Sequence, residues 1–130
     1  ETFTRAPGAT LLAVSSKCRL STGMMMVMCT YLNSDAGAWV RELRLCGRYA
    51  VDASYRMFAD MLKVNTTLTH IDMQGCNVSD AGVIIIAYAL RVNKSLTCVD
   101  VREGWYGSTG RQALEEAVKE RGTPLELMLD

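Results

Sequence analysis

The side chains with the most chemical potential recur at one interval along the chain. His70, the single histidine among 130 residues, precedes Cys98 by 28 positions, and Asp72 precedes Asp100 by the same interval. An imidazole, a thiol and a carboxylate are the groups of a nucleophilic triad, in which the base activates the thiol and the carboxylate orients the base. The residue types for such chemistry are therefore present. Whether they form a catalytic site depends on the structural elements that position them.

A triad also needs a pocket that excludes water and donors that stabilise an oxyanion, neither of which an open sheet face supplies. Zinc binding through His70, Cys98 and either Cys46 or Cys76 lacks the closely spaced ligand pair of a tetrahedral site. We therefore expect no catalysis, no metal and no cofactor. His70 is interpreted as a surface histidine beside a half-buried thiol.

The interval of 28 residues is a period of the whole chain. The block Leu68, Ile71, Met73, Cys76, Val78, Gly82, Ile86, Leu90, Asn93 recurs upstream from Val40 to Asn65 and downstream from Leu96 to Arg121. Such self-similarity is typical of solenoids, whose units bury their apolar sides only by stacking. Within each unit, alternating apolar residues predict a short strand, and spacings of three and four predict a helix after it.

Residues typical of helix starts and helix ends support this register. Asp52, Asp80 and Ser108 share the interval and are expected to accept hydrogen bonds at helix starts. Asn65 and Asn93 are expected to end their helices in the left-handed conformation. A divergent first repeat aligns with the third at an offset of 59, which places Leu12, Val14, Ser21, Gly23 and Val27 opposite Ile71, Met73, Asp80, Gly82 and Ile86, with extra residues at Asp35, Ala36 and Gly37.

The sequence thus predicts an α/β solenoid of about four strand–helix repeats followed by a terminal strand containing Leu127 and Leu129. The expected repeats span residues 9–39, 40–67, 68–95 and 96–123, with the last strand in 124–130. Residues 1–8 are interpreted as an N-terminal extension or a remnant of preceding sequence.

The stretch from Leu68 to Gly82, with Ala89 to Leu96, resembles the leucine-rich repeats of the ribonuclease-inhibitor type, a family that includes tropomodulin-like and Ran GTPase-activating proteins. The resemblance covers residues 9–130 and implies a parallel sheet on the concave side with helices outside. The family's asparagine or cysteine after each strand survives as Cys76, whereas Lys17, Arg48 and Gly104 occupy the equivalent positions. The loops of those repeats are expected to be irregular.

In the family's geometry, residues that alternate with the strand leucines face the concave side. We expect a protein partner there, and the candidate contacts are Glu42, Arg44, His70, Asp72, Gln74, Asp100 and Arg102. The favoured function is a non-catalytic protein–protein interaction module within a larger scaffold or adaptor. Two alternatives stay open: GTPase activation of the Ran kind, for which Arg48 could be offered, and a purely structural C-terminal stack of a longer repeat protein.

The first predicted helix, from Gly23 to Leu32, carries no charge, unlike the last one. Met24, Met25, Met26 and Met28 make it apolar nearly all round, a pattern typical of a helix covered on more than one side. Preceding repeats, a partner or second copy of the chain, or a folded N-terminal segment could each supply that cover. An oligomer or subunit contact through these methionines is therefore one expectation.

The composition of the chain limits the classes of partner and the cellular compartments that are expected. Fourteen basic residues balance 14 acidic ones, so no global charge recruits nucleic acid. The longest uncharged run is too short to span a bilayer. Five cysteines without a CxxC pair indicate free thiols in a cytoplasmic or other reducing intracellular compartment. The chain begins at Glu1, so organellar targeting by a removed leader is compatible with it.

Overall fold

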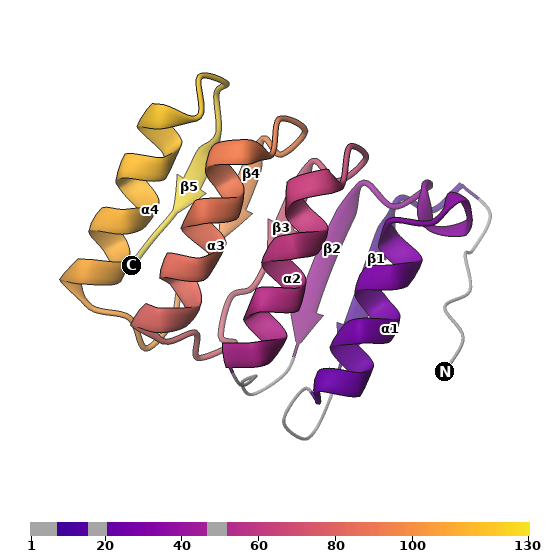
Figure 1. The fold of residues 1–130 in the computed structure, drawn as a ribbon, viewed down its shortest axis with the longest axis horizontal. Helices are drawn as coiled ribbons and strands as arrows, with labels where there is room; N and C mark the ends of the chain where they lie inside the picture. The colour runs from indigo at the N-terminus through magenta and orange to yellow at the C-terminus, as the bar shows by residue number, and fades with distance from the viewer. Residues whose placement is uncertain (1–7, 16–20, 47–51) are drawn as a thin grey trace.

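The computed structural model describes residues 8–15, 21–46 and 52–130, in which strands and helices alternate (Figure 1). The strands are β1 (Leu11–Ser15), β2 (Glu42–Cys46), β3 (His70–Asp72), β4 (Cys98–Asp100) and β5 (Glu126–Met128). The helices are α1 (Thr22–Leu32), α2 (Asp52–Val64), α3 (Asp80–Val92) and α4 (Ser108–Glu120), with a 3-10 turn, η1 (Asp35–Gly37), after α1. The expected order is confirmed, and η1 lies at the expected insertion.

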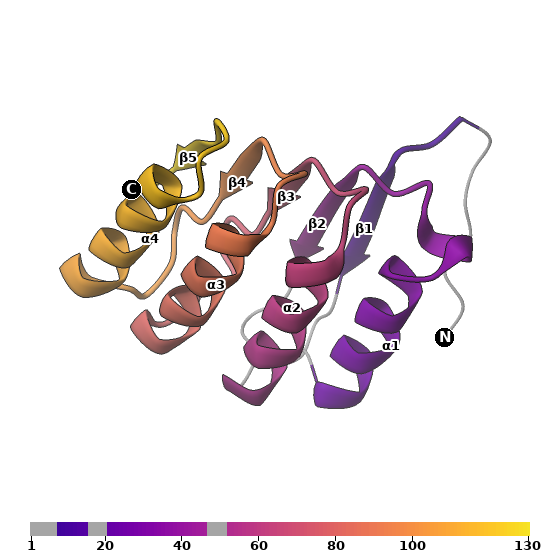
Figure 2. The same ribbon diagram turned by 45° about the horizontal axis from the view of Figure 1, so that its top comes forward.

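The strands form one parallel sheet in the order β1-β2-β3-β4-β5. Its register joins Leu12, Leu43, Ile71, Val99 and Leu127 in one row. Helices α1 to α4 lie side by side on a single face of the sheet (Figure 2). Neighbouring strands are about 4.8 Å apart whereas packed helices need about 8–10 Å. The stack must therefore bend with the sheet on its concave side, as a leucine-rich solenoid does.

The core lies between the sheet and the helices and is made by the repeating apolar positions. Leu43 and Ile71 from the sheet meet Phe58, Ile86 and Leu114 from the helices, and each is at most 2% exposed. Burying a side chain of this size stabilises the fold by roughly 1.5–3 kcal/mol. The periodic apolar residues therefore form the core, as the sequence predicted.

The rotation of α1 corrects one expectation. Val27 was expected on the inner stripe, but it is 46% exposed, and Met25 and Met28 are fully buried instead. The strand residues align with the third repeat at an offset of 59, whereas the helix aligns at 58, because Ser21 is the N-cap equivalent to Ser79. One additional residue between strand and helix in the first repeat turns the helix by about 100°.

The helix caps differ from expectation in a second way. The side chain that caps α3 is Ser79, whose Oγ accepts from the Gly82 amide at 3.2 Å, and Asp80 is the first helical residue. Asp80 Oδ1 instead accepts from the amides of Gly107 and Gly110, at 3.0 and 2.9 Å. It thereby caps α4, which has no cap from its own N-cap side chain. The side chain of Asp52 lies outside the described part of the chain.

Gly110 is required by this contact between repeats. A Cβ atom there would lie 2.6 Å from Asp80 Oδ1 and 2.5 Å from Val83 Cγ2. Both distances are shorter than a Cβ atom tolerates, so any larger residue would push α4 away from α3.

The expectation of left-handed asparagine caps is wrong. Asn93 has φ −65° and ψ 135°, an extended conformation. Its Oδ1 accepts from the amides of Ser95 and Leu96, and its Nδ2 donates to Leu62 O at 2.8 Å, in the preceding repeat. Asn65 repeats the pattern, accepting from Thr67 and Leu68 and donating to Leu32 O at 3.1 Å. The asparagines therefore bridge adjacent repeats.

Arg121 occupies the same position in the last repeat. It is 1% exposed, and its guanidinium donates to the carbonyl oxygens of Leu90, Asn93 and Leu96. Leu90 O is the counterpart of Leu62 O, so the arginine continues the asparagine series. Burial lowers the pKa of this guanidinium. Asn65, Asn93 and Arg121 are called the bridging ladder below.

Substitution of Asn93 by alanine should lower the free energy of unfolding by about 2–4 kcal/mol, because buried amides and carbonyls would lose their partners. Urea denaturation measures this loss. Asn33→Ala is the comparison: Asn33 is exposed, its Nδ2 donates to Met61 O at 3.3 Å and its Oδ1 accepts from Asn65 Nδ2 at 3.0 Å, so a smaller loss of about 1 kcal/mol is expected. Equal losses in the two variants would contradict a bridging role for Asn93.

Candidate functional site

The sheet face away from the helices brings the expected contact residues into rows. Strand register places Glu42 beside His70 and Cys98, and Arg44 beside Asp72 and Asp100, as the 28-residue interval predicted. Gln74 and Arg102 follow their strands and also meet, since Arg102 Nη2 donates to Gln74 Oε1 at 3.4 Å. The seven candidate residues therefore share one surface, which we call the concave face.

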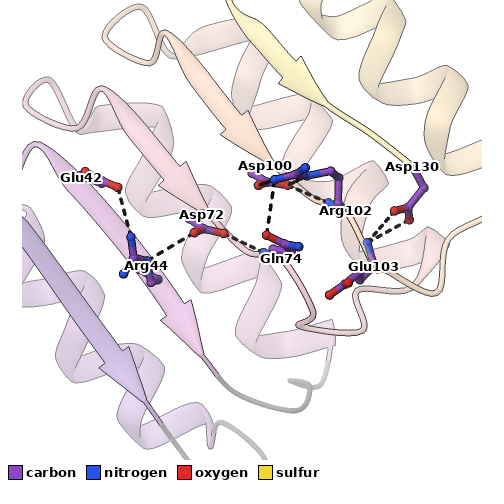
Figure 3. A network of polar contacts seen from close by, with 8 residues as sticks. All are labelled: Glu42, Arg44, Asp72, Gln74, Asp100, Arg102, Glu103 and Asp130. Carbon is purple, nitrogen blue, oxygen red and sulfur yellow. Dashed lines mark hydrogen bonds and ion pairs between the residues drawn. The ribbon is translucent and has the colours of Figure 1, made fainter.

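Polar contacts link the six candidate residues other than His70 across the strands (Figure 3). Arg44 lies between two carboxylates, 3.8 Å from Glu42 Oε1 and 3.4 Å from Asp72 Oδ2. Arg102 binds Asp100 with both Nε (3.0 Å) and Nη2 (2.8 Å). The concave face is thus an ordered ionic network in which both arginines have acidic partners.

Asp72 and Asp100 also shape the backbone at the ends of their strands. Asp72 Oδ1 accepts from the Gln74 amide, and Asp100 Oδ1 accepts from the Arg102 amide, each at 3.0 Å. Both contacts join residues two apart, which is the pattern of an Asx turn. Asp100 is only 6% exposed, and its bonds to Arg102 hold the pKa of its carboxyl below the usual range. It therefore acts mainly as a support for neighbouring groups.

The candidate residues other than Asp72 and Asp100 are available to a partner. Arg44, His70 and Gln74 are exposed, and Glu42 and Arg102 are half-buried. Their backbone is held by the parallel ladder and by the Asx turns, so their side chains project from a rigid support. Rigid supports of this kind lower the entropy lost on binding.

The geometry does not support nucleophilic chemistry at His70 and Cys98. The two residues are register neighbours, but His70 Nδ1 lies 2.9 Å from Thr69 Oγ1, a competing partner. Burial, followed by the nearby carboxylates of Glu126 and Asp100, raises the pKa of the Cys98 thiol, whereas a nucleophilic cysteine needs a lowered pKa. The described residues also include no group of three ligands able to hold a metal ion.

The structure adds residues that the sequence-based set missed. Glu103 turns past β4 with φ +58°, and its amide donates to both carboxylate oxygens of Asp130 at 2.9 Å. Trp105 follows and is 71% exposed. Asp130 and Glu126 could have been found from the 28-residue interval, but Glu103 and Trp105 lie in a loop whose residue types do not recur. Lys17 and Arg48 lie outside the described residues.

The Met-rich helix contributes less surface than expected. Met25 and Met28 belong to the core, Met24 is half-buried, and Met26 is 56% exposed. Its exposed apolar surface is continued by Val27. No described helix is long and apolar enough to span a bilayer.

Val27 occupies a helix position that is packed in α2, α3 and α4. Its equivalents Met57, Ile85 and Ala113 pack against the core. Met57 lines a groove with Cys29 of the preceding helix, and Ala113 lines one with residues of α3. This helix position therefore faces the preceding repeat, and in α1 it is left open.

Comparison with known families gives a match over part of the chain. Residues 64–87, which include the end of α2, β3 and most of α3, match the family described as "Leucine Rich repeat". This segment is therefore identified as a leucine-rich repeat. The repeat fold and the strand–helix order above agree with this match.

Solved structures support the same fold. The chain is similar to "Leiomodin-1 Actin-Binding Site 2 (ABS2)", with a TM-score of 0.79 and 24% sequence identity. The alignment covers 95% of this chain and 72% of that one. At this identity the likeness shows the fold alone. A search of curated proteins gives no match.

Replacement of Asp100 by asparagine should lower the free energy of unfolding by about 1–2 kcal/mol at pH 7, because it removes a charged acceptor from a nearly buried pair. The folded pKa of Asp100 is lowered, so its contribution is present above the unfolded pKa near 4 and is lost as the pH falls through the folded value. The difference between wild type and D100N should therefore shrink in acid.

Chemical denaturation between pH 7 and pH 3 measures this difference. Asp72→Asn is the matched control, since Asp72 makes the same Asx turn but its side chain is 31% exposed and its ion pair is longer. A smaller loss at pH 7 is expected for it. A D100N deficit that stays constant down to pH 3 would show that the charge of Asp100 does not stabilise the fold.

Proposed function

We propose that this leucine-rich-repeat chain is a non-catalytic protein-recognition module, acting within a larger scaffold or adaptor. The observation that supports it is the concave face, where Glu42, Arg44, His70, Gln74 and Arg102 project from a rigid parallel sheet. Asp72 and Asp100 orient these groups. Charged side chains of both signs in a fixed pattern select a partner by charge complementarity.

Actin is the first partner to test. The structural neighbour is titled as an actin-binding site of leiomodin-1, and it shares the fold over nearly the whole of this chain. A fold carries many functions, so the neighbour supplies a candidate and the concave face supplies the residues to be tested.

We also propose a reducing compartment such as the cytoplasm. Cys29, Cys76 and Cys98 are free thiols. Burial, and then the nearby Asp60, raises the pKa of Cys29 to about 12, which protects that thiol from oxidation. Cys76 is committed to the fold, since its Sγ donates to Leu45 O.

Substitution of Arg44 by glutamate should weaken actin binding by about tenfold, because a single well-placed interfacial charge contributes about 1.4 kcal/mol or more. Co-sedimentation with actin filaments and fluorescence titration with actin monomers measure binding. Arg56→Glu is the matched control: it makes the same charge change at an exposed position of α2 on the opposite side of the molecule, and it should bind as wild type does.

Equal weakening by both variants would assign the effect to net charge and would move the site away from the concave face. Wild-type protein that binds neither form of actin would remove actin as the partner. The concave face would then be tested with other proteins by the same pair of variants.

A contact at the N-terminal edge is a second proposed role, supported by the open position at Val27. If a second copy covers that edge, Val27→Lys should make the chain more strictly monomeric, since a charge there cannot be buried without a partner. Static light scattering over a range of concentrations measures association. A wild-type chain that stays monomeric at every concentration would argue against self-association, and Val64→Lys, at another exposed valine, is the control.

A further inference from the structure

The acceptor motif for N-linked glycosylation coincides twice with the bridging ladder. Residues 65–67 read Asn-Thr-Thr and residues 93–95 read Asn-Lys-Ser, so each asparagine is followed two positions later by a hydroxyl-bearing residue. Such motifs are typical of surface loops in secreted proteins. Here Asn65 is 6% exposed and Asn93 is 1% exposed. In the folded chain, both acceptors are therefore buried.

The side-chain nitrogens of these asparagines are already fully used. Asn65 Nδ2 donates to Leu32 O at 3.1 Å and to Asn33 Oδ1 at 3.0 Å. Asn93 Nδ2 donates to Leu62 O at 2.8 Å and to Asn65 O at 3.2 Å. A side-chain amide nitrogen carries two hydrogens, and in both residues the two are bonded to the preceding repeat. A sugar attached to the nitrogen replaces one of the hydrogens, so at least one of these bonds is lost.

The hydroxyl residues of the motifs also belong to the turn between helix and strand. Thr67 Oγ1 lies 3.4 Å from Asn65 Oδ1, and Ser95 Oγ lies 3.4 Å from Asn93 Oδ1. The amides of Thr67 and Ser95 donate to the same oxygens at 3.0 Å. Short polar residues suit such turns. The bridging ladder therefore accounts for both ends of the motif without a glycan.

The two asparagines differ in what a sugar would displace. Both acceptors of Asn93 are main-chain carbonyl oxygens within 3.2 Å of its nitrogen, so a sugar there must push the preceding repeat away. One acceptor of Asn65 is the side chain of Asn33, which is exposed and can turn aside. The cost of a glycan is therefore expected to be greater at Asn93 than at Asn65.

We propose that N-linked glycosylation of Asn93, and to a smaller extent of Asn65, prevents adjacent repeats from stacking, and that the chain folds in a compartment where this modification does not occur. In the transfer, Nδ2 of the unfolded chain bonds to the anomeric carbon of a lipid-linked oligosaccharide. One proton leaves the nitrogen, and the lipid pyrophosphate leaves the carbon. The proposal does not depend on the protein partner, and it narrows the proposed compartment to one outside the lumen in which such transfer takes place.

A third acceptor motif supplies an internal control. Residues 77–79 read Asn-Val-Ser, and Asn77 is half-buried in the turn after β3 with φ +55°. None of the contacts given by the described residues joins its side chain to another repeat. A glycan at Asn77 should therefore leave the stack intact.

The test compares full chains that each retain one acceptor. They are S95A/N77D, which keeps Asn65; T67V/N77D, which keeps Asn93; and T67V/S95A, which keeps Asn77. Aspartate at position 77 tolerates the left-handed conformation. Each chain is made without glycans in the bacterial cytosol and, behind a cleavable signal sequence, in the secretory pathway of mammalian cells. The mobility shift on glycosidase treatment reports the glycan, and the rate of protease digestion reports folding.

The chain glycosylated at Asn93 should be digested at least tenfold faster than the identical chain without a glycan, because proteolysis follows the population of the open chain. A loss of about threefold is expected at Asn65. The chain glycosylated at Asn77 should be as resistant as its unmodified form. It passes through the same oxidising compartment, so it also controls for oxidation of the thiols.

The wild-type chain made by both routes is a second measurement that involves no substitution, and it should show at least the tenfold loss. A glycan at Asn93 that leaves the digestion rate unchanged, a failure of Asn93 to take up a glycan in the secretory route, or an equal loss from a glycan at Asn77 would each overturn the proposal. None of these results alters the effect of Arg44→Glu on actin binding, so failure here is distinguishable from failure of the proposed function.

Discussion

The arrangement of the repeats depends on one interaction, the hydrogen bonds that each helix-to-strand turn makes to the end of the preceding helix. Asn65, Asn93 and Arg121 donate to the carbonyl oxygens of Leu32, Leu62 and Leu90. The last carbonyls of a helix have no partner within it, so these bonds satisfy groups that would otherwise be buried without one. They also fix where the next strand begins.

The use of arginine in the last position follows from the same requirement. Its guanidinium reaches three carbonyl oxygens at once, and its positive charge lies at the C-terminal end of α3, where the helix dipole favours a cation. Because strand positions are set by the bridging ladder, the rows of the concave face come into register without any contribution from the exposed side chains. Those side chains are consequently free to vary with the partner.

Much of the fold and part of the site could be predicted from the sequence. A period of 28 residues fixes which residues are neighbours on adjacent strands, so the rows through His70 and Asp72 followed directly. The helix rotation at α1 did not, because one additional residue before the helix shifts it relative to its strand. The bridging role of Asn93 was also missed, since the asparagine of one repeat bonds groups that belong to another.

The functional interpretation was limited for a related reason. The buried support role of Asp100 depends on Arg102 reaching back to it, which alternation along a strand does not reveal. Trp105 and Glu103 lie in a loop without counterparts in the other repeats, so a period-based search gives them no weight. Periodicity identifies the residues that repeats share, whereas this loop is made of residues that distinguish one repeat from the rest.

The carboxylate of Asp80, shared between the start of one helix and the amides of the next, bears on how such a chain could grow by duplication. A copied segment cut between strand and helix would separate Asp80 from Gly110 and leave the incoming helix uncapped. A segment copied together with its neighbour's first helical turn would keep the pair intact. Recombination that preserves stability in this stack is therefore expected at boundaries offset from those of the visible repeat.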